Sequence, residues 1–112
     1  MEYRKQKTKK KRQRHMESII QKKDGRCFLC REIRSPLEEH HIFGGPRRKI
    51  SEAEGLKVYL CIEHHRTGPS AVHRNKEMRE LLQAYAQQLW EEQNPERSWM
   101  DLMGKNYRGG NE

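Results

Sequence analysis

Two metal-ligand pairs far apart in the sequence constrain the fold of this chain more than any other feature. Cys27 and Cys30 form the first pair, Cys61 and His64 form the second, and two residues separate the members of each. Zinc prefers four nitrogen or sulfur ligands in a tetrahedron, and a turn with this spacing presents two of them together. The pattern therefore predicts one structural zinc ion that cross-links the two halves of the chain. Because His65 follows His64 directly, spacing alone leaves open which histidine completes the site.

The composition indicates a small domain that needs such a cross-link. The chain has 112 residues, of which 32% are hydrophobic and 36% are charged. A chain this short and polar buries only a small core, and small domains commonly gain stability from a bound metal. All three cysteines belong to the predicted zinc ligands, which leaves none for a disulfide and favours a cytoplasmic location. No apolar run approaches membrane-spanning length, so no membrane association is expected.

The net charge of +8 is concentrated at the N-terminus. Residues 1–14 contain eight Lys or Arg residues and one Glu, a net +7, against a net +1 for the rest of the chain. Like charges repel and nothing apolar is available to bury, so this segment is predicted to be a disordered arm. Such an arm would bind phosphates, and the residues nominated for this role are Lys9, Lys10, Lys11 and Arg12. A solubilising tail or a targeting signal is the alternative interpretation.

Hydrophobic patterning predicts an α+β domain over residues 15–103. A short apolar face predicts a helix that starts near Met16 and ends at Gly25. Residues 37–42 and 56–60 are expected to be strands, and the second runs straight into a zinc ligand. Between the strands, residues 51–54 fit a capping box for one helical turn that a glycine would end.

The C-terminal half is expected to be helical. Apolar residues at helical spacing predict an amphipathic helix from about Asn75 to Gln93. Its predicted core face comprises Met78, Leu81, Leu82, Tyr85, Leu89 and Trp90. Residues 98–103 are expected to add one turn, and residues 104–112 to form a flexible tail.

Clustered histidines suggest a second function for the same region. Five of the six histidines lie between residues 40 and 73, and His40 and His41 are adjacent on a predicted strand. Successive strand side chains point to opposite faces, so the two imidazoles are suited to different tasks. A metal-dependent nuclease needs a divalent cation that stabilises charge on the phosphate and a separate base of near-neutral pKa. The predicted zinc would bring His65 beside this pair, and the pattern favours phosphodiester hydrolysis.

The order Cys-x2-Cys, His-His-Ile and Leu-Cys-x2-His-His resembles the HNH (His-Me finger) endonucleases. More narrowly, it is similar to small phage nucleases of the recombination-enhancement, RecA-dependent kind. The resemblance covers about residues 27–73 and the helix that follows. It implies a zinc-stabilised ββα-metal fold in which a β-hairpin and a helix hold one catalytic divalent cation. It also implies DNA hydrolysis in a bacterial host cytoplasm, with a recombination or replication protein as a candidate partner.

Carried over by position, the resemblance implies that His41 is the general base. It implies that His40 and His65 ligate the catalytic ion, with His73 as a further candidate ligand. The middle Asn of the family motif has no counterpart between His41 and Cys61, so the sequence does not show what orients the base. Magnesium, manganese, nickel and zinc stay open as the catalytic ion, although an imidazole-rich site suits the last three better.

A short basic run follows the Gly44-Gly45 turn. Arg47, Arg48 and Lys49 would neutralise a phosphate backbone that the glycines allow to come close; a solvated loop is the alternative. No recognisable motif reads base edges, so little sequence specificity is expected.

Two other interpretations of the whole chain stay open. One is a non-catalytic zinc-binding module that binds nucleic acid, and the other is a zinc-stabilised interaction protein that uses the helix over 75–93.

Overall fold

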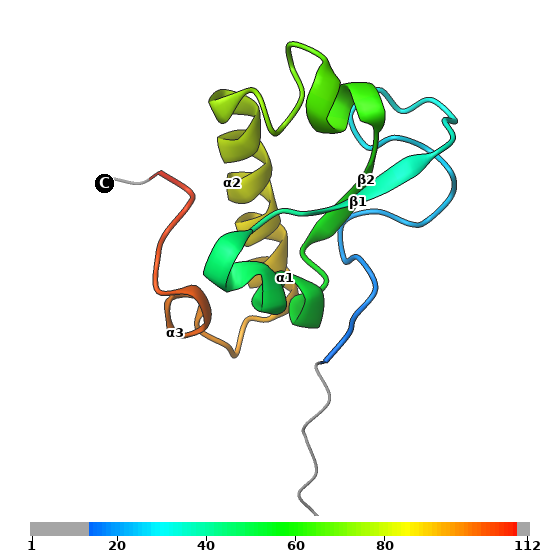
Figure 1. Ribbon diagram of the computed structural model, residues 1–112. Helices are drawn as coiled ribbons and strands as arrows, with labels where there is room; N and C mark the ends of the chain where they lie inside the picture. Colours follow the sequence, from blue (N-terminus) through cyan, green and yellow to red (C-terminus); the bar gives the residue numbers. More distant parts are fainter. Residues whose placement is uncertain (1–13, 110–112) are drawn as a thin grey trace, which may run out of the picture.

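The computed structural model describes residues 14–109, which form a two-stranded antiparallel sheet flanked by helices (Figure 1). In chain order the elements are β1 (Leu37–His41), the 3-10 turn η2 (Gly45–Arg47), α1 (Arg48–Glu54), β2 (Lys57–Cys61), the π-helical turn η3 (Glu63–Thr67), α2 (Lys76–Gln93) and α3 (Trp99–Met103). The architecture is therefore α+β. The arm cations Lys9, Lys10, Lys11 and Arg12 lie outside the described residues.

The pairing register of the hairpin sorts its side chains onto two faces. His40 is paired with Val58, and His41 is paired with Lys57. Paired residues share a face and successive residues alternate. His40 therefore lies on the same face as Glu38, whereas His41 lies on the opposite face with Lys57.

The two edges of this sheet differ. The outer edge of β2 is covered by an earlier part of the chain, because the Phe28 N–H donates to the Tyr59 carbonyl at 2.9 Å. Between residues 14 and 109, no backbone hydrogen bond joins the outer edge of β1 to another segment. β1 therefore presents an unpaired backbone edge.

Aromatic side chains connect the hairpin side of the core to the C-terminal helices. The ring of Trp99 lies 5.4 Å from those of both Trp90 and Phe43, and Tyr107 lies 4.7 Å from Phe43. The backbone N–H of Tyr107 also donates to a side chain of α2, Gln87, at 2.7 Å. The packed part of the chain thus extends beyond the boundary predicted at residue 103.

The helix predicted to start near Met16 is wrong. The N–H of Met16 donates to the Glu52 carbonyl at 3.0 Å, and the N–H of Ile19 donates to the Gly55 carbonyl at 2.9 Å. These backbone donors bond to α1 and its end, so they do not close helical turns. Gly55 is required here, because its φ is +74° and a Cβ would collide with the carbonyl of Glu17. Tertiary hydrogen bonds outweigh the local helical pattern in this segment.

Helix α1 begins earlier than expected. It starts at Arg48, and Ser51 lies inside the helix rather than at its N-cap. The Ser51 hydroxyl donates to the Phe43 carbonyl at 2.9 Å and accepts from the Phe43 N–H at 3.0 Å. The predicted capping box is therefore wrong, because the serine joins α1 to the end of the hairpin. Gly55 ends the helix in a left-handed conformation, as the sequence predicts.

Helix α2 spans Lys76–Gln93, and the side chain of Asn75 caps its N-terminus by accepting from the Met78 N–H. Its buried apolar residues are Leu82, Ala86 and Trp90, spaced four apart. Leu81 and Tyr85, which the sequence places on the core face, are 65% and 44% exposed. The buried face of α2 is therefore shifted around the helix relative to the predicted face, and it includes the small Ala86 and the polar Gln87.

In the described chain, no helix is long and apolar enough to cross a lipid bilayer.

Candidate metal centres

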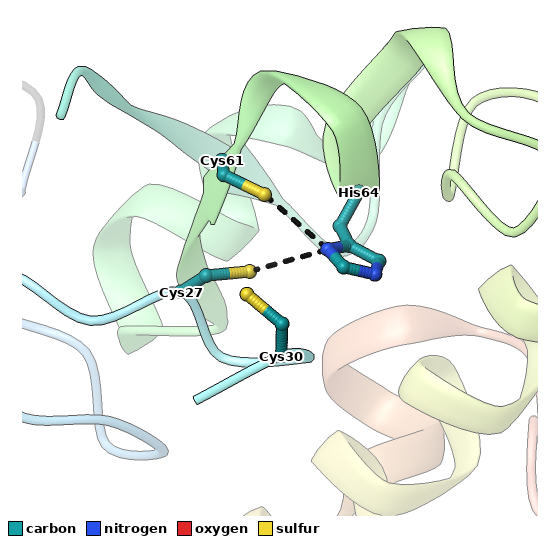
Figure 2. Close-up of side chains that lie close together, drawn as sticks. All are labelled: Cys27, Cys30, Cys61 and His64. Atoms are coloured by element: carbon teal, nitrogen blue, oxygen red, sulfur yellow. Dashed lines mark hydrogen bonds between the residues drawn. The ribbon is translucent and has the colours of Figure 1, made fainter. Parts of the chain in front are cut away.

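Three cysteines and one histidine converge where β2 meets η3 (Figure 2). Cys61 ends β2 and His64 lies in η3, while Cys27 and Cys30 come from a turn in which the Arg31 N–H donates to the Cys27 carbonyl. The three sulfur atoms point toward the same side of the His64 ring. The four ligand atoms all lie within 4.8 Å of one another.

The distances within this Cys3His cluster fit a tetrahedral ion. Nδ1 of His64 is 3.2 Å from Sγ of Cys61 and 3.8 Å from Sγ of Cys27. A tetrahedral zinc ion separates a bound sulfur from a bound nitrogen by roughly 3.6 Å. The cluster could therefore hold a metal ion such as zinc. His64 completes it, and the neighbouring His65 points into a different group.

The thiols of this cluster differ in acidity. Burial raises the pKa of Cys27, but hydrogen bonds from the backbone at Cys30 and Cys61 outweigh it, so this pKa lies below its ordinary value. Burial raises the pKa of Cys61. Because the thiolate is the ligand form, Cys27 is the better prepared of the two donors.

A second group brings together three imidazoles from three segments. His40 comes from β1, His65 from η3 and His73 from the loop before α2. The ring of His40 lies 5.2 Å from both other rings, which are 4.6 Å apart, and the Nε2 atoms of His65 and His73 are 3.0 Å apart. We call this group the histidine trio. His40 is buried and His73 is exposed, so the trio opens to solvent at His73.

Backbone hydrogen bonds hold the loop of His73 against η3. The N–H of His73 donates to the His65 carbonyl at 3.2 Å, and the N–H of Val72 donates to the His64 carbonyl at 2.9 Å. The same short turn therefore carries one ligand of the Cys3His cluster and anchors two members of the trio. The two groups are coupled through η3.

Glu38 orients His65 within the trio. Nδ1 of His65 lies 2.7 Å from Oε1 of Glu38, whose carboxylate also accepts two hydrogen bonds from Arg66, at 2.9 and 2.6 Å. These hydrogen bonds, from Arg66 first and then from His65, lower the pKa of Glu38 to about 2. An ionised carboxylate only accepts, so Nδ1 of His65 carries the proton. In neutral His65 the lone pair is then on Nε2, which faces the trio.

Two imidazoles of the trio, those of His40 and His73, favour the neutral form. Burial, together with the neighbouring His65 and His73, lowers the pKa of His40 to about 3. Burial is also the main cause that lowers the pKa of His73. A neutral imidazole has a free lone pair, which is the form that binds metal ions. The nitrogen atoms of the trio lie within 4.8 Å of one another, so this group could also hold an ion.

His41 lies in a third group, apart from the trio. Its Nε2 atom is 2.7 Å from Oε1 of Glu52 and 3.8 Å from Oε1 of Glu39. The fully buried Lys57 places its ammonium 3.2 Å from Glu39 and 3.3 Å from Glu52. The Lys57 ammonium therefore bridges the two carboxylates of this group. As strand alternation predicts, His41 lies on the face of β1 opposite His40, and it belongs to a different group from the histidine trio.

The nominated cations have different surroundings. The Nε–H of Arg47 donates to the Met103 carbonyl at 3.1 Å, so this side chain joins η2 to α3. Arg48 and Lys49 are exposed on α1, and Arg48 lines a surface hollow of about 340 Å³ beside His41. Sequence reasoning missed Arg79, which donates to the Val72 carbonyl at 3.0 Å and whose positive charge contributes to the low pKa of His40.

Sequence reasoning also missed the roles of two glutamates. Glu38 could have been found, because it lies two residues before His40 and so shares its strand face. Glu52 and Lys57 carry no local signal, because their contact with His41 depends on how α1 folds back onto the hairpin.

A scan of protein-family models finds no match, and searches of curated proteins and of solved structures find no significant match. The HNH resemblance therefore stays a prediction from the residues.

Proposed function

We propose that this protein is a metal-dependent endonuclease that hydrolyses DNA phosphodiester bonds. The observation that supports this best is the convergence of His40, His65 and His73, from three separate segments, on one point that opens to solvent. A non-catalytic zinc module needs only the Cys3His cluster and leaves this convergence unexplained. Imidazoles that converge on one point can hold a divalent cation in their neutral form, which the lowered pKa values of His40 and His73 favour.

Zinc in the Cys3His cluster would stabilise the segment that carries the trio. It would connect the turn at Cys27 to η3, where His64 and His65 are adjacent. Because the trio depends on the position of η3, the proposed zinc has a structural role. All four of its ligand positions belong to the protein, which leaves none for a substrate.

In the proposed reaction the trio would hold the catalytic cation, and Glu38 would keep Nε2 of His65 available for it. The bound cation would stabilise the charge that develops on the phosphate and the leaving oxygen. An all-nitrogen ligand set favours manganese, nickel or zinc over magnesium. Arg79, beside His40 and His73, would add positive charge where the phosphate lies.

His41 is proposed to take the proton from the attacking water. It lies on the face of β1 opposite His40, and the backbone edge of β1 between these faces is unpaired among the described residues. In-line displacement requires the attacking and leaving oxygens on opposite sides of phosphorus. A phosphodiester along this edge would meet the base on one side and the trio on the other. The water oxygen then bonds to phosphorus as the bond to the 3′ oxygen breaks. The departing 3′ oxyanion takes a proton from solvent, which leaves 5′-phosphate and 3′-hydroxyl ends.

Binding to DNA is proposed to rest on non-specific phosphate contacts. Arg48 and Lys49 are exposed on α1, and Arg48 lines the hollow beside His41. The N-terminal arm would add affinity through its concentrated positive charge. No described feature reads base edges, so substrate choice is expected to depend on the shape of the DNA.

Plasmid nicking tests the proposal. Zinc-loaded wild type, His40→Ala and His41→Ala are compared with added manganese, nickel, zinc or magnesium. The expected result is nicking by the wild type and a loss of about 10²- to 10⁴-fold in His41→Ala with unchanged DNA binding. Gel-shift affinity and zinc content serve as controls for folding. Equal nicking by the wild type and His40→Ala would show that the trio is not the catalytic site.

A further inference from the structure

We infer that Glu52 is a positioning residue for His41: it holds the imidazole with its proton on Nε2, so that Nδ1 is the atom that takes the proton from water. This inference rests on the proposed function, in which His41 is the base. It assigns a role to a residue of α1 that no motif in the sequence singles out. It also identifies what orients His41 in a chain that has no Asn between His41 and Cys61.

The first support is the geometry of the contact. Nε2 of His41 lies 2.7 Å from Oε1 of Glu52, within hydrogen-bond distance, whereas the nearest oxygen of Glu39 is 3.8 Å away. The His41 side chain is 8% exposed and that of Glu52 is 18% exposed. Water therefore competes only weakly for this hydrogen bond, and Glu52 is the carboxylate that orients the ring.

The second support is that Glu52 is itself held in place. Both of its oxygen atoms lie 3.3 Å from Nζ of Lys57, and the Lys57 side chain is 1% exposed. His15 contacts the second oxygen from the N-terminal side. Lys57 is also the register partner of His41 across the hairpin. The carboxylate is thus fixed by the same strand pair that carries the base.

The third support is the charge state of Glu52. Hydrogen bonds from His41, His15 and Lys57 lower the pKa of Glu52 to about 2, so it is ionised at neutral pH. An ionised carboxylate accepts hydrogen bonds and donates none. The shared proton therefore belongs to Nε2 of His41, and a neutral ring keeps its lone pair on Nδ1.

The polar partners of the His41 ring gather at one of its two nitrogen atoms. Within residues 14–109, the hydrogen bond and ion pairs of the His41 side chain all involve Nε2. The ring borders the hollow of about 340 Å³ that Arg48 also lines. A water molecule fits a hollow of this size, and the Arg48 guanidinium would attract a phosphate against the negative charge of Glu39 and Glu52, which also line the hollow. Glu52 thus acts through His41 and makes no contact with the reacting atoms.

The test compares Glu52→Gln with Glu39→Gln. Each variant removes one negative charge beside Lys57, but only the first changes the group bonded to His41. Nitrogen NMR of the histidine rings in the zinc-loaded protein should show the Nε2–H form of His41 in wild type and in Glu39→Gln, and a mixed form in Glu52→Gln. In nicking assays, Glu52→Gln should lower kcat about 10- to 100-fold with unchanged KM, while Glu39→Gln stays close to wild type.

The outcomes separate this inference from the function on which it rests. A wild type that nicks DNA with an equal kcat in Glu52→Gln overturns the role of Glu52 alone, as does an Nδ1–H form of His41 in wild type. A wild type that nicks DNA with none of the four ions overturns the proposed function, and the role of Glu52 in hydrolysis with it. Zinc content and the unfolding midpoint establish that each variant is folded, and NMR reports on the ring whether or not activity is present.

Discussion

Glu38 and His65 are joined by a 2.7 Å contact between a carboxylate oxygen and Nδ1, which directs Nε2 of the imidazole toward His73. The two residues come from β1 and η3, and the contact sets the orientation of a side chain in the histidine trio. A carboxylate that accepts from the far nitrogen of a ligating histidine also makes that histidine a stronger donor. This relationship leads directly to the first prediction.

Glu38→Gln is expected to weaken binding of a divalent cation at the trio by about 10- to 100-fold. The amide removes the negative charge that fixes the tautomer of His65 but nearly keeps the shape of the side chain. Calorimetric titration of manganese into protein with a filled Cys3His cluster measures the change. Glu39→Gln is the matched control, because it removes a charge from the adjacent residue on the opposite face of β1. Equal affinities in the two variants would contradict the orienting role of Glu38.

Cys61→Ser is expected to remove the zinc ion and destabilise the fold. An ion that binds only the folded chain contributes about 4 kcal/mol when its free concentration is a thousand times its dissociation constant. Absorption of the cobalt-substituted protein should lose its thiolate band in this variant, and urea unfolding should shift to lower concentrations. His73→Ala is the control, since it alters a candidate ligand of the trio only. If this variant kept its full zinc content and wild-type stability, the Cys3His cluster would not be a metal site that stabilises the fold.

Glu54→Gln is expected to cost about 1–3 kcal/mol, because the buried carboxylate accepts from the Trp90 ring N–H and from Arg97. The hydrogen bonds from Arg97 are the largest cause that holds the pKa of Glu54 below its usual range, against the effect of burial. A lowered pKa favours the ionised form in the folded state. This stabilisation is therefore fully present above the unfolded-state pKa of Glu and is lost as the pH falls through the lowered value.

Urea unfolding measured over a range of acidic pH checks this sign. Wild type should lose stability faster than Glu54→Gln as the pH falls, so the two curves should approach each other. Glu80→Gln provides the comparison for a surface pair, since its contact with Lys76 is 3.9 Å long and exposed. That change should cost only about 0.3–0.5 kcal/mol. Parallel pH profiles for wild type and Glu54→Gln would show that ionised Glu54 does not stabilise the folded state.

The double variant Arg48→Ala/Lys49→Ala is expected to weaken DNA binding and reduce its salt dependence. Two lost phosphate contacts lower the slope of log affinity against log salt by about 1.8 for duplex DNA. Fluorescence anisotropy at several salt concentrations measures the slope. Arg47→Ala is the contrasting change: it breaks the hydrogen bond to Met103 and should reduce stability with little effect on the slope. An unchanged slope in the double variant would exclude α1 from the DNA-binding surface.

Local spacing in the sequence was enough to identify several of these features. The two residue pairs of the Cys3His cluster, the strand β2 and the glycine that ends α1 each depend on residues a few positions apart. Such residues share a turn or a face whatever the rest of the chain does. The same reasoning failed for the segment near Met16 and for the capping box at Ser51, because their backbone and hydroxyl groups bond to distant parts of the chain.

Contacts between separate elements could come only from the folded chain. Sequence spacing placed His40 and His41 on opposite faces of a strand, but it could not show that Glu38 meets His65 or that Glu52 meets His41. Those pairs form because η3 and α1 fold back onto the hairpin, and their positions depend on packing along the whole connection. Likewise, the spacing of apolar residues predicts the helix α2, but the elements packed against α2 determine which of those residues are buried. Chemistry that depends on two distant side chains is therefore a property of the packing, whereas chemistry within one turn can be read from the residues themselves.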